Sequence, residues 1–177
     1  MPGAEEAVKP LPSYTNSPLA TYTNISPHNN APRNKPITKI TPHHAAGVMS
    51  LESLSQTLIS RNISANYCIS GGRIGLTLDE KNRPWTSSSQ ANDQTAVTVE
   101  IANSAEGGNW PISDKDIEAF IQLSVDVCRR NGIPRLYYDG TPNGTLTLHR
   151  DLASTLCPGP YFISKIPYIC ERVNAEI

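Results

Sequence analysis

The sequence lacks several features that would assign a protein to a class directly. No apolar run approaches the roughly 18 residues that a membrane-spanning helix requires, so we expect no such helix. The formal net charge is only -1, so no excess of one sign attracts nucleic acid or an anionic membrane surface. The first residues also lack a basic segment followed by an apolar one. We therefore expect synthesis in a cytoplasm without a secretory signal, with later release by another factor.

Cysteine is also scarce. The four cysteines, Cys68, Cys128, Cys157 and Cys170, are widely separated in a chain of 177 residues. Such spacing does not indicate a disulfide framework in a chain of this length. We expect Cys68, Cys128 and Cys170 to pack in a strand and two helices, and the length to suit one domain with a real core.

Composition divides the chain into two regions. Residues 1–36 are rich in Pro, Ser, Thr and Asn. This composition predicts an extended N-terminal arm in which about the first 12 residues are disordered. Residues 37–177 are expected to form one folded domain.

Hydrophobic periodicity and turn residues predict the elements of this domain. Strands are expected at 37–43, 66–70, 73–78, 96–102 and 146–149, and helices at 50–59, 113–131 and 161–173. Gly71 and Gly72 suit the turn of a hairpin, Ser50 and Ser113 are helix N-caps, and Gly132 is placed to end the long helix. Because strands and helices interleave, the fold class is α/β, with a central mixed sheet flanked by helices.

Histidine and cysteine residues from distant segments could meet at one metal ion. His149 and Cys157 lie near the C-terminus, and His43 and His44 follow the first strand. Two imidazoles and one thiolate would leave the fourth position of a zinc ion for water, which distinguishes catalytic zinc from structural zinc. Only one of His43 and His44 should face the ion, because neighbours on a strand point to opposite faces. The alternative is a buried structural cysteine and ordinary surface histidines.

Glu100 lies on a strongly patterned strand. Val97, Val99 and Ile101 share one face of this strand, so Glu100 points to the other face. One interpretation is a solvent-exposed carboxylate. The other is a general base beside the metal that activates its water.

Four further side chains each allow two interpretations. Tyr67 is either a strand aromatic that packs on the sheet or a phenol that donates a hydrogen bond to a developing oxyanion. Thr155 either caps a local turn or donates to a substrate carbonyl. Trp85 and Trp110 lie in polar loops, where each could stack on a ligand or cover the edge of the core.

Taken together, these segments resemble the zinc-dependent N-acetylmuramoyl-L-alanine amidases of type 2. That family includes phage endolysins, bacterial cell-wall amidases and the animal peptidoglycan recognition proteins. The resemblance covers roughly residues 35–175, and the segments 13–19 and 85–89 look most like endolysins of phages that infect clostridia and related Gram-positive bacteria. Its motifs are residues 40–47, 66–69, 72–75, 96–101 and 149–159.

The resemblance implies a role for each matching position. It places the zinc ligands at His43, His149 and Cys157, with His44 in a variable position beside the first ligand. It also implies a catalytic glutamate at Glu100. The tyrosine beside the metal in this family falls on Tyr67. The chain departs from the family pattern at two positions.

The first departure is Thr155, which stands where some members have a lysine, so the group that stabilises the tetrahedral intermediate is left open. The second is Pro42, which stands where an apolar or β-branched residue is more usual. This proline could shift the neighbouring ligand slightly.

The implied activity is hydrolysis of the amide bond between N-acetylmuramic acid and L-alanine, with Zn2+ as cofactor. The implied partner is bacterial peptidoglycan, reached after release from the host cell, with no nucleic acid or membrane partner. One alternative is a module of the same fold that binds peptidoglycan without cutting it. Another is a structural zinc site in an unrelated domain, with Cys68 or His44 as a fourth ligand.

Overall fold

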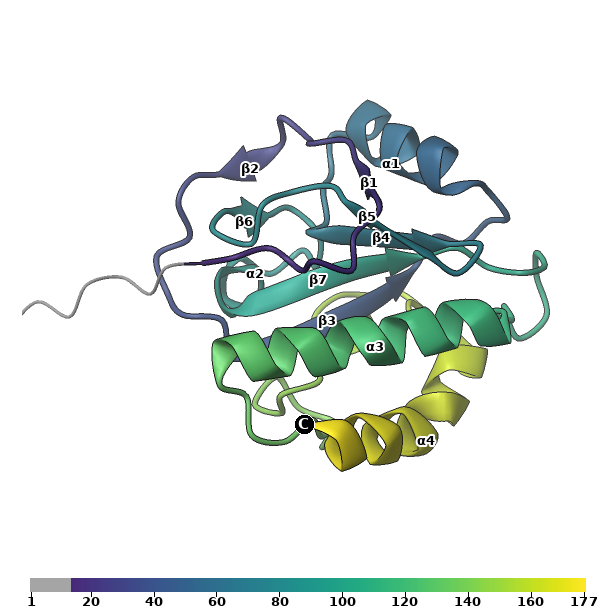
Figure 1. Ribbon diagram of the computed structural model, residues 1–177. Helices are drawn as coiled ribbons and strands as arrows, with labels where there is room; N and C mark the ends of the chain where they lie inside the picture. The colour runs from purple at the N-terminus through teal and green to yellow at the C-terminus, as the bar shows by residue number, and fades with distance from the viewer. Residues whose placement is uncertain (1–13) are drawn as a thin grey trace, which may run out of the picture.

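A five-stranded mixed β-sheet forms the centre of the molecule in the computed structural model, which describes residues 14–177 (Figure 1). The strand order is β1-β5-β4-β7-β3, and only β4 and β5 run antiparallel to each other. The strands are β1 (Tyr22–Thr23), β3 (Lys39–His44), β4 (Tyr67–Ser70), β5 (Arg73–Leu76) and β7 (Ala96–Ile101). A small second sheet pairs β2 (Asn29–Asn30) with β6 (Arg83–Pro84).

Helices cover both faces of the central sheet (Figure 1). Helices α3 (Asp114–Asn131) and α4 (Pro160–Glu176) lie on one face, and α1 (Leu51–Ser60) lies on the other. The short helix α2 (Gln90–Thr95) leads directly into β7, and a 3-10 helix, η1 (His149–Asp151), precedes α4. The predicted α/β architecture is confirmed.

The two faces of β7 have different chemistry. Val97, Val99 and Ile101 belong to the larger core cluster, together with Phe120 of α3. The opposite face carries Glu100 and lies toward α1, where the smaller core cluster includes Cys68 and three leucines of that helix. A polar group is therefore held inside the molecule on the α1 side of the sheet.

The predicted ends of α3 are confirmed. The Ser113 hydroxyl accepts a hydrogen bond from the backbone N–H of Asp116 at 3.2 Å. Gly132 ends the helix with a left-handed φ of 67°, a conformation that costs glycine little. The Asp116 carboxylate accepts from the backbone N–H of Gly72 at 2.7 Å, and so ties α3 to the β4–β5 turn.

The described part of the N-terminal arm is integrated into the domain. Strand β1 pairs in parallel with β5 at the edge of the central sheet. The Arg33 side chain is fully buried and binds backbone oxygens of the main body. Its guanidinium donates to the carbonyls of Glu80, Asn82, Asp93, Gln94 and Ala96. The predicted disorder of about the first 12 residues concerns positions that lie outside the described residues.

The predicted strand at 146–149 is wrong. Leu146 forms only an isolated parallel bridge with Ile40 of β3. The chain then turns, because the carbonyl of His149 accepts from the backbone N–H of Leu152 at 2.9 Å within η1. His149 therefore sits on a turn at the sheet edge rather than on a strand.

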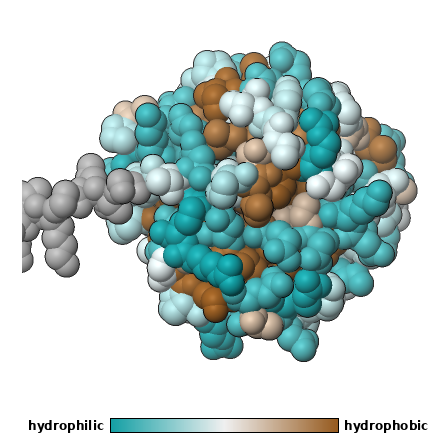
Figure 2. All heavy atoms as spheres, in the orientation of Figure 1, coloured by the Kyte–Doolittle hydropathy of each residue, from teal (hydrophilic) through white to brown (hydrophobic). Residues whose placement is uncertain are grey.

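The cysteines at 68, 128, 157 and 170 are free thiols. None of the helices within residues 14–177 has the length and apolar character needed to cross a bilayer. Figure 2 shows a largely hydrophilic face on which hydrophobic side chains reach the surface in separate groups.

Candidate metal centre and active-site cleft

His43 is positioned by the pairing of two parallel strands. It is the next-to-last residue of β3 and lies opposite Glu100, the next-to-last residue of β7. Both side chains therefore emerge on the α1 side of the sheet, near the carboxyl ends of the strands. Ligands of open α/β sheets commonly bind at this end.

Three side chains converge beside this strand end. One ligand atom each from His43, His149 and Cys157 lies within 4.8 Å of the others. Cys157 Sγ is 3.5 Å from His43 Nδ1, and the two imidazole centroids are 4.8 Å apart. His149 comes from η1 and Cys157 from the loop before α4, so the structure brings together three segments that the sequence separates.

The donor set fits a zinc ion. With Zn–S near 2.3 Å and Zn–N near 2.0 Å, tetrahedral geometry separates sulfur and nitrogen by about 3.5 Å. Burial, and next the charge of His149, hold the pKa of His43 well below its usual value, so this imidazole is neutral and able to ligate. Burial, and next Glu100, raise the pKa of the Cys157 thiol. A bound cation would favour its thiolate.

A cleft of about 210 Å³ opens onto these three residues. Glu100 lines it with only 7% of its surface exposed. Burial raises the pKa of Glu100 to about 8, and the positive charge of Arg61 opposes this rise. The cleft is thus lined by a carboxyl group, three imidazoles (His43, His44 and His149) and a thiol. Other residues lining it include Ala45, Met49, Leu54, Leu58, Ile63 and Thr86.

Tyr67 lies elsewhere. In β4 it pairs with Val99, whereas Cys68 pairs with Glu100, so the Tyr67 ring points to the face away from the cleft. Its buried hydroxyl donates to Glu80 and accepts from the backbone N–H of Ser17 at 2.7 Å. The structure therefore does not bring Tyr67 to the metal cluster. Its ring packs on the sheet within the larger core cluster.

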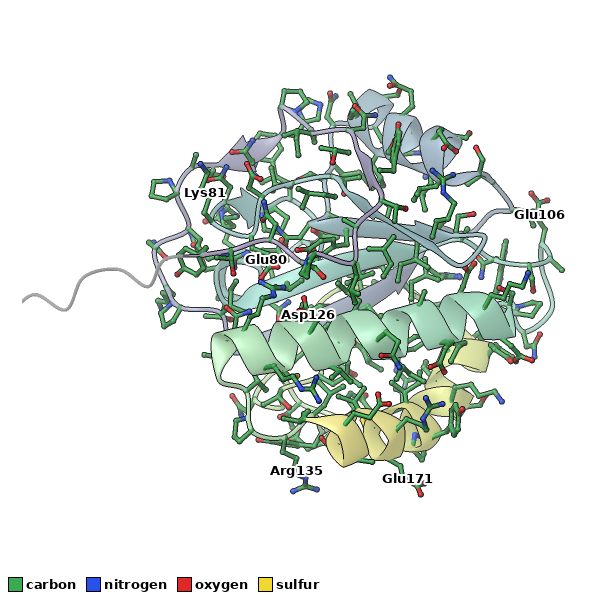
Figure 3. The ribbon with its side chains drawn as sticks, in the orientation of Figure 1. Glu80, Lys81, Glu106, Asp126, Arg135 and Glu171 are labelled. Atoms are coloured by element: carbon green, nitrogen blue, oxygen red, sulfur yellow. The ribbon has the colours of Figure 1, made fainter. Side chains whose placement is uncertain are left out.

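Glu80 is the centre of that second polar cluster. Its carboxylate is 2.7 Å from the guanidinium of Arg130, which also pairs with Asp126 at 2.8 Å. Figure 3 shows Glu80 and Asp126 at the junction between the loop after β5 and helix α3. This cluster joins the arm, the sheet and α3 on the side remote from the cleft.

His44 and Trp110 contact each other at the edge of the site. Nδ1 of His44 is 3.3 Å from the amide nitrogen of Asn103, and its ring meets that of Trp110 edge-on at 5.5 Å. His44 is not part of the three-residue cluster. Of the two strand histidines, His43 is the one that the structure places with His149 and Cys157.

Thr155 and Trp85 lie at accessible positions. Thr155 lines the cleft, and its hydroxyl accepts from the backbone N–H of Cys157 at 3.2 Å. Trp85 is 39% exposed, stacks on His28 with ring centroids 5.7 Å apart, and borders a second pocket of about 610 Å³. Ile63 and Thr86 line both pockets, so the two are adjacent.

The sequence did not single out two side chains that lie at the site. Arg61, which follows α1, is the only lysine or arginine among the residues that line the cleft. Ser87 places its hydroxyl 3.3 Å from Nε2 of His43. No local signal marks either residue, because each reaches the site only through the packing of its segment against β3 and β7.

Known proteins share this fold. PlyL, in a mutant form, is 13% identical with a TM-score of 0.69, covering 87% of this chain and 98% of that chain. The Staphylococcus aureus hydrolase AmiA in complex with its ligand is 15% identical with a TM-score of 0.65, covering 88% and 82%. The endolysin N-acetylmuramoyl-L-alanine amidase LysCS from Clostridium intestinale is 17% identical with a TM-score of 0.60, covering 84% and 96%.

A family-level comparison gives the assignment. No curated protein matches the sequence. The family model described as N-acetylmuramoyl-L-alanine amidase matches residues 33–160, which include β3, the hairpin, β7 and the loop carrying Cys157. The chain therefore belongs to the N-acetylmuramoyl-L-alanine amidase family of peptidoglycan hydrolases.

Proposed function

We propose that the protein hydrolyses the amide bond between N-acetylmuramic acid and L-alanine at a zinc ion held by His43, His149 and Cys157. The observation that carries this proposal is the convergence of these three donors in one cleft with Glu100. Three donors suit catalytic zinc, since closed structural sites have four protein ligands. Neither Cys68 nor His44 belongs to the cluster as a fourth donor.

Glu100 is the proposed general base. Bound zinc would supply a positive charge that polarises the scissile carbonyl, makes a nearby water more acidic and favours the charged form of the Glu100 carboxyl. The Glu100 carboxylate accepts the proton of the attacking water and delivers it to the L-alanine amine as that group leaves. Its burial keeps bulk water from competing for this proton.

Thr155 and Arg61 are the proposed groups for the developing oxyanion. Both line the cleft, and they contribute a hydroxyl and a positive charge respectively. Tyr67 is left out of this set, because its hydroxyl is engaged with Glu80 on the other side of the sheet.

The glycopeptide is proposed to extend across both pockets. The cleft and the pocket beside Trp85 adjoin at Ile63 and Thr86, and an exposed indole offers a flat apolar surface to a sugar ring or peptide. The bond to be cut would lie at the metal cluster, with the remainder of the substrate along Trp85.

Metal removal and Cys157→Ser test the proposal. The chelated protein and the variant should both stay folded, while release of new amino groups from purified cell walls falls to the background rate. Cys170→Ser is the matched control, because Cys170 is a free, partly buried cysteine of α4 outside the cluster. This control should retain zinc and full activity. Full amine release by the chelated protein would refute the metal role.

The second candidate is a module that binds peptidoglycan without cleaving it. The same assay decides between the two, since such a module would sediment with cell walls and release no amino groups. The presence of Glu100 next to the donor cluster favours hydrolysis.

We further propose that the protein is a phage endolysin, made in the cytoplasm of the bacterial host and acting on the wall after release. The likeness in fold to proteins described as endolysins supports this origin. Expression in a bacterial host with and without a pore-forming partner tests it, and lysis should occur only when the partner is present.

A further inference from the structure

A buried polar network lies beneath the metal cluster. It consists of Thr41, Ser87, Asn92 and Thr147, which come from β3, the loop before α2, α2 itself and the segment before η1. Thr41 lies two residues before His43, and Thr147 lies two residues before His149. The network therefore connects the two segments that carry the histidines.

Asn92 closes a ring of hydrogen bonds in this network. Its amide nitrogen donates to Thr41 Oγ1 at 2.9 Å, and its amide oxygen accepts from Thr147 Oγ1 at 3.0 Å. The two threonine oxygens are 2.8 Å apart. Because the Thr147 proton goes to Asn92, Thr41 is the donor between the threonines, and every donor in the ring has an acceptor.

The same amide reaches the metal cluster through Ser87. Asn92 Nδ2 lies 3.5 Å from Ser87 Oγ, which in turn lies 3.3 Å from His43 Nε2. The loop holding Ser87 is fixed, since one carboxylate oxygen of Asp93 accepts the backbone N–H groups of Thr86 and Ser87, each at 3.1 Å.

This arrangement gives the two nitrogens of His43 different partners. Nδ1 faces Cys157 Sγ, and Nε2 faces the Ser87 hydroxyl. Metal binding through Nδ1 requires the proton on Nε2, where the Ser87 hydroxyl oxygen is placed to accept it. Partners of this kind orient metal-binding histidines and raise metal affinity.

We propose that Ser87 and Asn92 are positioning residues for the metal centre: Ser87 sets the tautomer and ring orientation of His43, and Asn92 sets the spacing between the segments that carry His43 and His149. This inference rests on the proposed zinc site. It adds residues that touch neither the substrate nor the metal.

Zinc affinity of Ser87→Ala, measured by competition with a chromophoric chelator, tests the role of the hydroxyl. We expect a loss of about 10- to 100-fold, the usual effect of removing such a partner. Ser124→Ala is the matched control, because Ser124 is a buried serine of α3 whose hydroxyl has no hydrogen-bond partner within residues 14–177. This control should bind zinc as tightly as the parent protein.

The cobalt(II)-loaded proteins provide a readout that a general loss of stability would not move. The absorption bands of cobalt report ligand geometry, so Ser87→Ala and Asn92→Ala should both shift them, and Ser124→Ala should not. Metal-free Ser87→Ala should stay folded and melt at or below the temperature of metal-free Ser124→Ala, because only Ser87 has hydrogen-bond partners to lose. If Asn92→Ala fails to fold, Ser87→Ala still decides the question.

Two results would overturn the inference: parent-like affinity and cobalt bands in Ser87→Ala, or an equal loss of affinity in Ser124→Ala. A parent protein that binds no zinc would refute the metal site itself. Zinc binding by the parent, together with an unchanged affinity in Ser87→Ala, would refute the positioning role and leave the metal site intact.

Discussion

Glu100 is an ionisable residue set deep in an apolar sheet yet open to the cleft on one side. Every residue of β7 around it is buried, and Glu100 itself is only 7% exposed. Burying such a group is unfavourable unless something in the cleft compensates. The burial of Glu100 in the cleft therefore supports its proposed role as a general base.

Glu100→Gln should lower kcat by about 10²- to 10⁴-fold, because the amide cannot accept the proton of the attacking water. Zinc content should be unchanged, since Glu100 is not among the three converging donors. Steady-state kinetics on cell-wall fragments, with metal analysis of the same sample, measure both quantities. A zinc-loaded variant with parental kcat would rule Glu100 out as the base.

Tyr67→Phe distinguishes a structural tyrosine from a catalytic one. The change leaves the Ser17 N–H without its acceptor and removes one donor from the buried Glu80 carboxylate, which keeps Arg130, so we expect a loss of about 1–3 kcal/mol in unfolding free energy. The folded variant should keep parental kcat, because the ring faces away from the cleft. Urea unfolding and kinetics together provide the check, and a large fall in kcat with parental stability would contradict this placement.

At the scale of elements, the described arm contributes to the fold through Arg33. Its buried guanidinium donates five hydrogen bonds to backbone oxygens near β6, α2 and β7. A side chain used in this way ties the segment before β3 to the region of β6, to the end of α2 and to the start of β7. The segment before β3 is thus part of the packing that supports the cleft.

Arg33→Ala should destabilise the protein by about 3 kcal/mol or more, because several buried carbonyls lose a charged donor together. Arg135→Ala is the control, since Arg135 is exposed and projects away from the body in Figure 3. Chemical denaturation of both variants tests this. Similar midpoints for the two variants would show that the arm is not an integral part of the fold.

Elements with strong local signals could be predicted from the sequence. Helix α3 has an apolar stripe between the Ser113 cap and Gly132, and the β4–β5 hairpin has two glycines at its turn. The segment at 146–149 could not be predicted as a turn from its apolar alternation. Leu146 pairs with β3 at one isolated bridge, and the backbone then turns into η1. Local alternation does not reveal where a chain leaves a sheet.

The candidate site likewise contains some residues that the sequence could indicate and others that it could not. The residue types and their resemblance to a family identified His43, His149 and Cys157, which the structure brings together. The face on which Tyr67 lies depends on register with β7, a long-range property that the strand pattern alone does not contain. Ser87 reaches His43 only through tertiary packing, so no local pattern could indicate it.

At the scale of the whole molecule, the buried carboxyl affects stability as a function of pH in the metal-free protein. The pKa of Glu100 is raised from its ordinary value of 4.5 to about 8. The folded state therefore holds this proton more tightly than the unfolded state does. The resulting stabilisation is complete below the unfolded pKa and is lost as pH rises through the folded pKa.

Comparison of metal-free Glu100→Gln with metal-free parent isolates this effect from the titration of the histidines. The unfolding free energy of the variant should gain on that of the parent as pH rises from about 4.5 to about 8, and the difference should then level off. Urea unfolding of both proteins across this range is the measurement. A difference that does not change with pH would show that Glu100 titrates normally.

His43 and Cys157 approach each other across 114 positions of the chain. An ion held between them would act as a reversible cross-link that closes a very long loop, and such closures restrict the unfolded chain strongly. A chain cut by a protease within that interval would then remain as two fragments joined through the metal ion. Resistance of the folded protein to such cleavage would then depend on the free zinc concentration as much as on its own packing.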